Sequence, residues 1–141
     1  MANIQSRVDH VKQTYEKFFS GSLEGFLEIF EEDSILIEVD TLPYGGGATG
    51  PAAIRAMILK MIDSWEDIRF DIHEFTSGDR SVVALGTFSA RSKPNGIAVR
   101  FPHAEVWEFD DQDRLVRLNP IYGDTKQVAD AFMQVAPDGC A

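Results

Sequence analysis

The sequence has 141 residues, of which 44% are hydrophobic and 26% are charged. This composition is typical of a globular protein, so we expect one domain over residues 1–141 and exclude disordered and fibrous classes. The formal net charge of −10 argues against nucleic-acid binding, because contact with a phosphate backbone requires a basic surface.

The single cysteine and the lack of long apolar runs indicate the compartment. Cys140 has no second cysteine with which to form an internal disulfide, which is typical of a reducing compartment. No apolar run approaches the length needed to span a membrane, and the N-terminal residues lack the apolar core of a signal peptide. We therefore expect a cytoplasmic protein without membrane contact.

Two helices, a strand and a loop are expected in the first third of the chain. Residues 4–19 place apolar side chains at helical spacing, with Arg7 among the charged residues of the opposite face. A shorter helix is expected over residues 23–30. Residues 34–40 are rich in β-branched side chains and predict a strand. The glycine-rich residues 41–50 predict a loop.

A third helix and the first of several strands follow. Residues 51–65 begin with a proline, which is favoured at the first position of a helix. Residues 69–75 alternate in polarity and predict a strand. Its period of two places Phe70 and Ile72 on one face and Phe75 on the other.

Three further strands are predicted over residues 81–91, 101–109 and 115–122, joined by short turns. Asp124 or Thr125 is then expected to cap a short helix. Three helices followed by a meandering sheet predict an α+β domain.

The small side chains of Ala84 and Gly86 suggest that a strongly bent sheet would leave space inside it. The residues after 136 are expected to fray.

The strand over residues 101–109 contains the main candidate site. At a period of two, Phe101, His103, Glu105, Trp107 and Phe109 point the same way. An imidazole and a carboxyl group then lie on an otherwise aromatic face, where ionised groups are costly. Their presence on that face indicates a functional site.

Other interpretations of these two side chains stay open. Glu105 is alternatively a buried carboxylate paired with Arg55 or Arg117, and His103 is alternatively a hydrogen-bonded core residue. The pair supplies two metal ligands on one strand, but the spacing assigns no third, so we expect no metal.

The chain also resembles a known family, the ketosteroid isomerase and SnoaL-like group of the nuclear-transport-factor-like fold. The likeness extends over residues 15–124. It rests on Gly21-Ser-Leu-Glu-Gly25 between two helices, Phe30-Glu-Glu-Asp33 before a strand, Thr49-Gly-Pro-Ala-Ala-Ile-Arg55, and Glu105-Val-Trp-Glu-Phe109 through Tyr122-Gly123. The resemblance implies a cone-shaped barrel, formed by a strongly curved mixed or antiparallel sheet packed on three N-terminal helices.

The resemblance also implies roles for individual residues. Steroid isomerases carry a protonated aspartate at the position of Glu105, where it donates a hydrogen bond to an enolate oxygen. Their base lies on the first strand, where this chain offers Glu38 and Asp40. Their oxyanion-hole tyrosine falls nearest Thr14. The adjacent Tyr15 is one helical step away, which turns it by roughly 100°.

Two further residues are candidates by comparison with the family. In the cyclases of this family an acid near the last strand acts as acid and base, and Asp124 is the nearest match, although its simpler role is a helix cap. His103 matches no isomerase residue. It is well placed to replace the missing tyrosine as donor, or to act as the base, because imidazole titrates near neutrality.

The resulting hypothesis is a cofactor-independent acid/base enzyme of the isomerase or cyclase type. Its substrate would be an apolar, carbonyl-bearing small molecule such as a polyketide, terpenoid or steroid-like compound. Glu38, Asp40 or His103 would move the proton, and a protonated Glu105 would donate to the oxyanion. We expect the substrate to be bound by Tyr15, Trp65, Phe88, Trp107, Leu118 and Tyr122.

Two alternatives belong to other classes. One is water addition of the epoxide hydrolase type, which needs an aspartate–arginine–aspartate group. The other is a non-catalytic ligand-binding or dimerisation module, with Glu105 held by an arginine. By resemblance to the family we also expect a homodimer formed through the outer face of the sheet, where Val83, Leu85 and Val106 supply apolar area.

Overall fold

The computed structural model describes residues 4–133 and confirms an α+β fold. Its helices are α1 (Ile4–Phe19), α2 (Leu23–Leu27), α3 (Pro51–Ser64) and α4 (Thr125–Phe132). Its strands are β1 (Phe30–Glu38), β2 (Gly46–Thr49), β3 (Trp65–Ser77), β4 (Ser81–Ser92), β5 (Ala98–Phe109) and β6 (Leu115–Tyr122).

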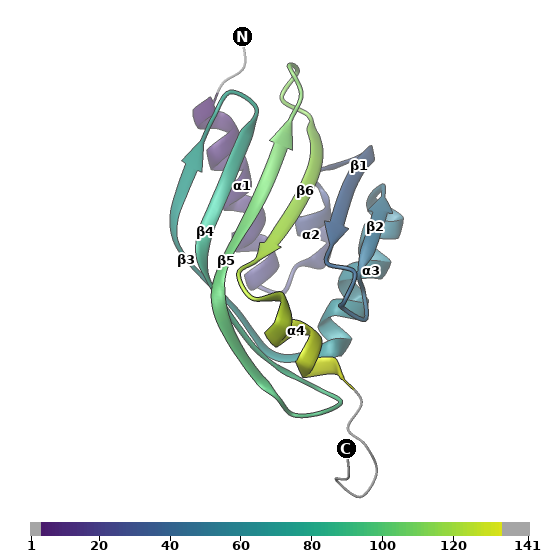
Figure 1. Ribbon diagram of the computed structural model, residues 1–141. Coiled ribbons are helices and arrows are strands. Elements are labelled where there is room, and N and C mark those ends of the chain that lie inside the picture. Colours follow the sequence, from purple (N-terminus) through teal and green to yellow (C-terminus); the bar gives the residue numbers. More distant parts are fainter. Residues whose placement is uncertain (1–3, 134–141) are drawn as a thin grey trace, which may run out of the picture.

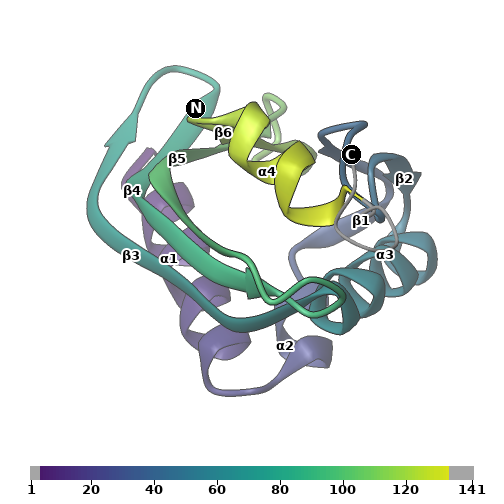
Figure 2. The ribbon, with the colours of Figure 1, turned by 60° about the horizontal axis from the view of Figure 1, so that its bottom comes forward.

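The strands form one mixed sheet in the order β2-β1-β6-β5-β4-β3. Only the pairing of β1 with β6 is parallel, among the strands described. The sheet is strongly curved, as Figures 1 and 2 show. Helix α3 contacts β1, β2 and β3, and therefore joins the two ends of the sheet. This curvature confirms the expected cone, and α4 lies across its end (Figure 2).

The second predicted helix is shorter than expected, and β1 begins earlier. Helix α2 ends at Leu27, and the acidic residues 31–33 belong to β1 instead of ending a helix. Ser34 explains this local structure, because its hydroxyl group accepts a hydrogen bond from the Glu31 amide (2.7 Å) and donates one to the carbonyl of Leu115 (2.6 Å). These contacts attach the start of β1 to β6.

The glycine-rich segment is also more ordered than predicted. Residues 46–49 form β2 and pair with residues 35–38 of β1. The pairing satisfies backbone hydrogen-bonding groups at the edge of β1 that would otherwise need water.

A bulge in β3 corrects the predicted position of Phe75. The pairing of β3 with β4 shifts between Ile72 and Glu74. One extra residue reverses the alternation of side chains. Phe75 therefore lies on the inner face with Phe70, and its ring centroid is 6.1 Å from that of Tyr15.

The small residues of β4 do not create interior space, contrary to expectation. A side chain at Gly86 would collide with the carbonyl oxygen of Asp71 in β3, so glycine here allows the two strands to approach. Ala84 is fully buried. Neither residue lines the cavity between the inner face of the sheet and helices α1, α2 and α3.

Arg7 was expected on the exposed face of α1 but is only 3% exposed. Its guanidinium group binds the carboxylate of Asp113 and the carbonyls of Asp79 (2.6 Å) and Asp110 (3.0 Å). Arg7 lies one helical turn before Val11, on the apolar stripe. It thus connects the start of α1 to two hairpin turns.

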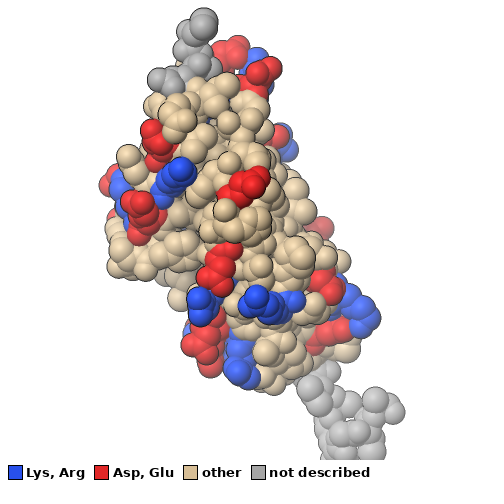
Figure 3. Space-filling view, turned by 90° about the vertical axis from the view of Figure 1, so that its left-hand side faces the viewer, with Lys and Arg blue, Asp and Glu red and all other residues tan. Residues whose placement is uncertain are grey.

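Charged side chains of both signs are interspersed over the face of the molecule shown in Figure 3, with tan surface between them. No basic patch gathers on that face. Within residues 4–133, no helix is long and apolar enough to cross a membrane.

Candidate functional site

The curved sheet and its helices enclose an internal cavity of about 60 Å³. Its walls are mainly aromatic and aliphatic, and they include the carboxyl groups of Glu38 and Glu105. No lysine or arginine is among the described residues that line it. Typical ligand pockets are larger, roughly 300–1,000 Å³. Phe19 lines the cavity and is 50% exposed, which places an opening at the end of α1.

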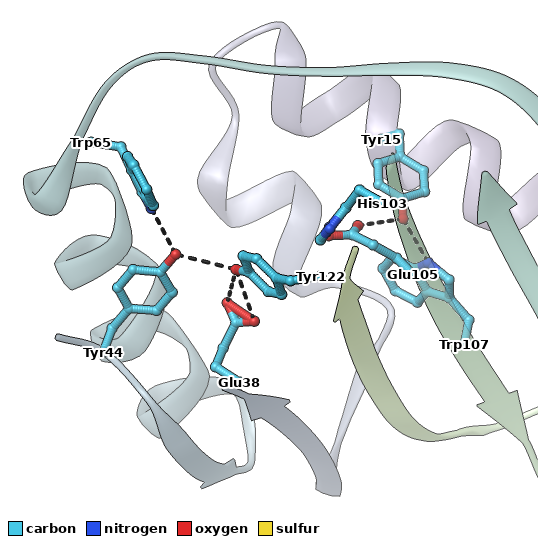
Figure 4. A network of polar contacts seen from close by, with 8 residues as sticks. All are labelled: Tyr15, Glu38, Tyr44, Trp65, His103, Glu105, Trp107 and Tyr122. Atoms are coloured by element: carbon cyan, nitrogen blue, oxygen red, sulfur yellow. Dashed lines mark hydrogen bonds and ion pairs between the residues drawn. The ribbon is translucent and has the colours of Figure 1, made fainter. Parts of the chain in front are cut away.

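Glu38 is the last residue of β1 and is 5% exposed. The hydroxyl group of Tyr122 in β6 lies 3.3 Å from each carboxyl oxygen of Glu38. Tyr44 lies 3.2 Å from Tyr122, and the indole nitrogen of Trp65 lies 2.8 Å from the Tyr44 oxygen. An indole N–H can only donate. The hydrogen bonds therefore run from Trp65 through both phenols to Glu38, as drawn in Figure 4.

Burial sets the acidity of this first group of residues. Burial, and secondly the charge of Glu105, raise the pKa of Glu38 well above its ordinary value, and the hydrogen bond from Tyr122 offsets part of the rise. Burial also raises the pKa values of Tyr44 and Tyr122, with the charge of Glu38 as the next cause. These phenols therefore stay protonated and act as donors.

Glu105 in β5 is the centre of a second group of residues. Tyr15 in α1 donates a hydrogen bond of 2.6 Å to Oε1 of Glu105, and the Trp107 indole N–H donates to the Tyr15 oxygen at 2.8 Å. Nε2 of His103 lies 3.0 Å from Oε2 of Glu105. Burial, followed by the charge of Glu105, raises the pKa of Tyr15. Tyr15 is thus a neutral donor with a fixed direction.

His103 is buried among aromatic rings and has one free ring nitrogen. Its ring centroid lies 4.9 Å from that of Phe70 and 4.7 Å from that of Tyr122. Nδ1 has no hydrogen-bond partner within the described residues. A hydrogen on Nε2 satisfies Glu105 and leaves only a lone pair unpaired at Nδ1. The imidazole is therefore best placed to fix the orientation of Glu105.

The two groups have the same order of side chains, from indole through phenol to carboxyl. Figure 4 shows Trp65, Tyr44, Tyr122 and Glu38 on one side, and Trp107, Tyr15, Glu105 and His103 on the other. The edge-to-face contact between His103 and Tyr122 connects the two groups. Two hydrogen-bonded acids thus line one apolar cavity.

The structure separates the two acids predicted on the first strand. Ser34, Leu36 and Glu38 alternate inward along β1 and are buried. The strand ends at Glu38, and Asp40 lies in the following turn, where it is exposed. Asp40 therefore does not join the cavity.

The six predicted substrate-binding residues divide into two sets. Tyr15, Phe88 and Leu118 line the cavity. Trp65, Trp107 and Tyr122 lie outside its lining. Trp107 and Tyr122 donate hydrogen bonds to the lining residues Tyr15 and Glu38, and Trp65 acts one step further away, through Tyr44.

Tyr15 points toward Glu105, contrary to the expectation that it points away from the site. The hydroxyl group of Thr14 instead donates to the carbonyl of His10 at 2.8 Å. The rotation of α1 about its own axis turns Tyr15 toward Glu105. This rotation depends on how the helix packs and could not be predicted from the sequence.

The arginines considered as partners of Glu105 bind other acids. Arg117 pairs with Glu108 at 2.6 Å, and Arg55 pairs with Glu24 at 2.8 Å. The interpretation of Glu105 as a carboxylate held by one of these arginines is therefore wrong.

Asp124 caps the N-terminus of α4, which was one of its two predicted roles. Its carboxylate accepts the Gln127 backbone N–H at 3.0 Å, and this hydrogen bond is the main cause that lowers the pKa of Asp124. Asp124 does not line the cavity. No group of three or more His, Cys, Asp or Glu side chains is arranged to hold a metal ion within residues 4–133.

Tyr44 is the main residue of the candidate site that the sequence did not identify. It lies in the segment predicted as a loop, yet it is buried and contacts Tyr122 and Trp65. The signal in the sequence that could have identified Tyr44 was a large aromatic residue directly before three glycines. Its partners could not be identified from sequence, because they come from distant strands.

The raised pKa of Glu38 predicts how stability depends on pH. The native protein keeps this proton to higher pH than the unfolded chain does, so the free energy of unfolding falls as pH rises from the ordinary value of 4.5 through the raised pKa of Glu38. Urea denaturation at a series of pH values should show this fall, and Glu38→Gln should remove it.

Asp40→Asn is the matched control, because Asp40 is exposed near the same strand end. It should leave the pH dependence unchanged. An identical slope in the wild type and in Glu38→Gln would contradict the assignment of a buried acid.

The sequence and the fold were compared with known proteins. A family model described as a SnoaL-like domain matches residues 11–118. A search of curated proteins finds no match. An NTF2-like protein of unknown function from Burkholderia pseudomallei has 25% sequence identity and a TM-score of 0.81, over 95% of this chain and 100% of that chain.

Two other solved structures share the fold at lower identity. A candidate SnoaL-like polyketide cyclase from Shewanella denitrificans is 15% identical, with a TM-score of 0.70 over 89% of this chain and 95% of that chain. A protein from Catenulispora acidiphila with a ketosteroid isomerase-like fold is 12% identical, with a TM-score of 0.71 over 89% and 94%. The family match and this shared fold show that the chain belongs to the SnoaL-like family.

Proposed function

We propose that the protein is a cofactor-independent acid/base enzyme of the isomerase or cyclase type. Its substrate would be an apolar molecule that bears a carbonyl group, such as a polyketide, terpenoid or steroid-like compound. The supporting observation is that the carboxyl groups of Glu38 and Glu105, on different strands, share one apolar cavity. Proton transfer beside a carbonyl needs a base and a hydrogen-bond donor on the same substrate.

Glu38 is the proposed base. A carboxylate with a raised pKa binds a proton more strongly, and a pKa closer to neutrality suits general base catalysis. Asp40 is exposed and outside the cavity. His103 directs Nε2 to Glu105 and is therefore less free to act on a substrate.

Glu105 is the proposed group that stabilises the developing oxyanion. A protonated Glu105 would supply the donor, positioned by the single phenol proton of Tyr15 at its Oε1 and by His103 at its Oε2. The Trp107 N–H in turn fixes the direction of Tyr15. Donors that are already oriented need no rearrangement as charge develops.

The other two interpretations have less support. Water addition of the epoxide hydrolase type needs an arginine between two aspartates, and neither residue type lines the cavity within the described residues. A non-catalytic module was expected to hold Glu105 with an arginine. Its partners are instead Tyr15 and His103.

The role of Glu38 can be tested with cyclohex-3-enone, a small ketone whose conversion to the conjugated enone is followed by ultraviolet absorption. Glu38→Gln should lower the rate by about 10²–10⁴-fold, because an amide cannot accept the substrate proton. Asp40→Asn should react like the wild type. Absence of conversion by the wild type, or full conversion by Glu38→Gln, would contradict the proposal.

The same assay tests Glu105. Glu105→Gln should retain part of the activity, because the amide N–H₂ still donates a hydrogen bond, whereas Glu105→Ala should lose most of it. Equal and undiminished rates in both variants would remove Glu105 from the mechanism.

We also propose a homodimer formed through the outer face of the sheet. Leu85 pairs with Ala104, which pairs with Ile121, and Val83 pairs with Val106 on the same face. Ile121 is 50% exposed. An apolar row of this kind favours burial against a second copy.

Sedimentation equilibrium should report a dimer for the wild type and a monomer for Ile121→Glu, because the new carboxylate would be buried without a partner. The exposed Val116 lies nearer the β5–β6 turn, so Val116→Glu serves as a control for added charge. A monomeric wild type would disprove the proposed dimer.

A further inference from the structure

The charge of the cavity selects its ligands. Two carboxyl groups line it, and no lysine or arginine does so within the described residues. The whole chain carries a formal net charge of −10. Glu105 has Tyr15 and His103 as partners, and Glu38 has Tyr122, so no guanidinium or ammonium group neutralises either acid. An anionic ligand would be repelled by the ionised acids, whereas a cation would stabilise their ionised forms and so oppose the burial that raises the pKa of Glu38.

The aromatic walls add a second attraction for a cation. Rings of Tyr15, Phe18, Phe19, Phe26, Phe70 and Phe88 line the cavity. The Tyr15 ring centroid lies 5.9 Å from that of Phe70 and 6.1 Å from that of Phe19, so several rings face one small volume. Aromatic rings attract organic cations, above all when water is excluded.

The size of the cavity limits the ligand. A volume of about 60 Å³ leaves room for more than one water molecule but is well below the roughly 300–1,000 Å³ of typical ligand pockets. A small ligand therefore suits this cavity better than a large one.

We propose that this cavity binds a small alkylated ammonium ion, with Glu38 and Glu105 as counter-charges and the aromatic rings as the remaining walls. Alkyl groups suit this site better than free N–H groups, because the walls offer few acceptors besides the two carboxyl groups. Binding makes and breaks no covalent bond. It uses Glu38 and Glu105 in their ionised forms, whereas the proposed reaction uses a protonated Glu105, so the two proposals share the cavity but are tested separately.

Cation binding is linked to protonation of Glu38. The charge of Glu105 is one cause of the raised pKa of Glu38, and a bound cation opposes it. The other titratable groups near the two acids are Tyr122 and Tyr44 beside Glu38, and Tyr15 and His103 beside Glu105. Binding should therefore release protons at pH values where Glu38 is protonated, and affinity should rise with pH over that range.

Calorimetric titration with tetramethylammonium chloride tests the proposal, with tert-butanol as a neutral ligand of similar size and shape. The wild type should bind the cation about tenfold or more tightly than the alcohol, with heats that depend on the ionisation enthalpy of the buffer. Of the two tryptophan indole N–H signals in nuclear magnetic resonance spectra, that of Trp107 should shift through its contact with Tyr15.

Variants that remove one charge distinguish the effect of the cavity acids on cation affinity from the effect of the chain's net negative charge. Glu38→Gln and Glu105→Gln should each weaken cation binding, and the double variant should lose the preference over tert-butanol. Glu74→Gln removes a charge from an exposed position of β3 and should bind like the wild type.

Equal affinities for the cation and the alcohol, undetectable binding of the cation, or an unchanged cation affinity in the double variant would each overturn the proposal. A wild type that binds tetramethylammonium but does not convert cyclohex-3-enone would contradict only the proposed reaction. Conversion of the ketone without cation binding would contradict only the ammonium site.

Discussion

A carboxyl group can be buried among aromatic rings only if its oxygens are hydrogen-bonded. Tyr122 provides this contact for Glu38, and Tyr15 and His103 provide it for Glu105. The rest of the site depends on these contacts, because they keep two acids beside a cavity from which basic side chains are absent among the lining residues. The curved sheet makes the contacts possible by bringing β1, β5, β6 and α1 together (Figures 1 and 4).

The two acids have unequal surroundings, which suits them to different roles. Glu38 receives hydrogen bonds only from a phenol, within the described residues, and burial raises its pKa. Glu105 has a phenol and an imidazole as partners, and its side chain is 19% exposed. Pairs of titratable groups in different environments are a common basis for assigning an acid and a base. In both groups an indole N–H donates to the oxygen of a phenol and so fixes the direction of the phenol O–H.

The supports of the site come from segments that are far apart in the sequence. Trp65 begins β3, Tyr44 lies between β1 and β2, and Tyr122 ends β6. Each is buried and hydrogen-bonded to a residue of another segment, so a substitution there would disturb packing and hydrogen bonding together. The aromatic residues outside the cavity lining therefore matter because they hold the lining residues in place through hydrogen bonds and packing.

Local periodicity was sufficient to predict the fold and part of the site. The spacing of apolar residues predicted α1, α3 and the strands from β3 to β6, because both helices and half-buried strands repeat their side-chain direction over short distances. The same alternation placed His103 and Glu105 on the inner face of β5, where the structure has them. The resemblance to the SnoaL-like family added the cone-shaped architecture.

Only the tertiary structure decided which of these residues form the site. The end of β1 includes Glu38 and leaves Asp40 in solvent, the rotation of α1 brings Tyr15 to Glu105, and a bulge turns Phe75 inward. Arg7 and Tyr44 are buried because their partners come from distant turns and strands. Sequence patterns report the direction of a side chain within its own element, whereas partners depend on how elements pack, and that packing is a non-local property of the chain.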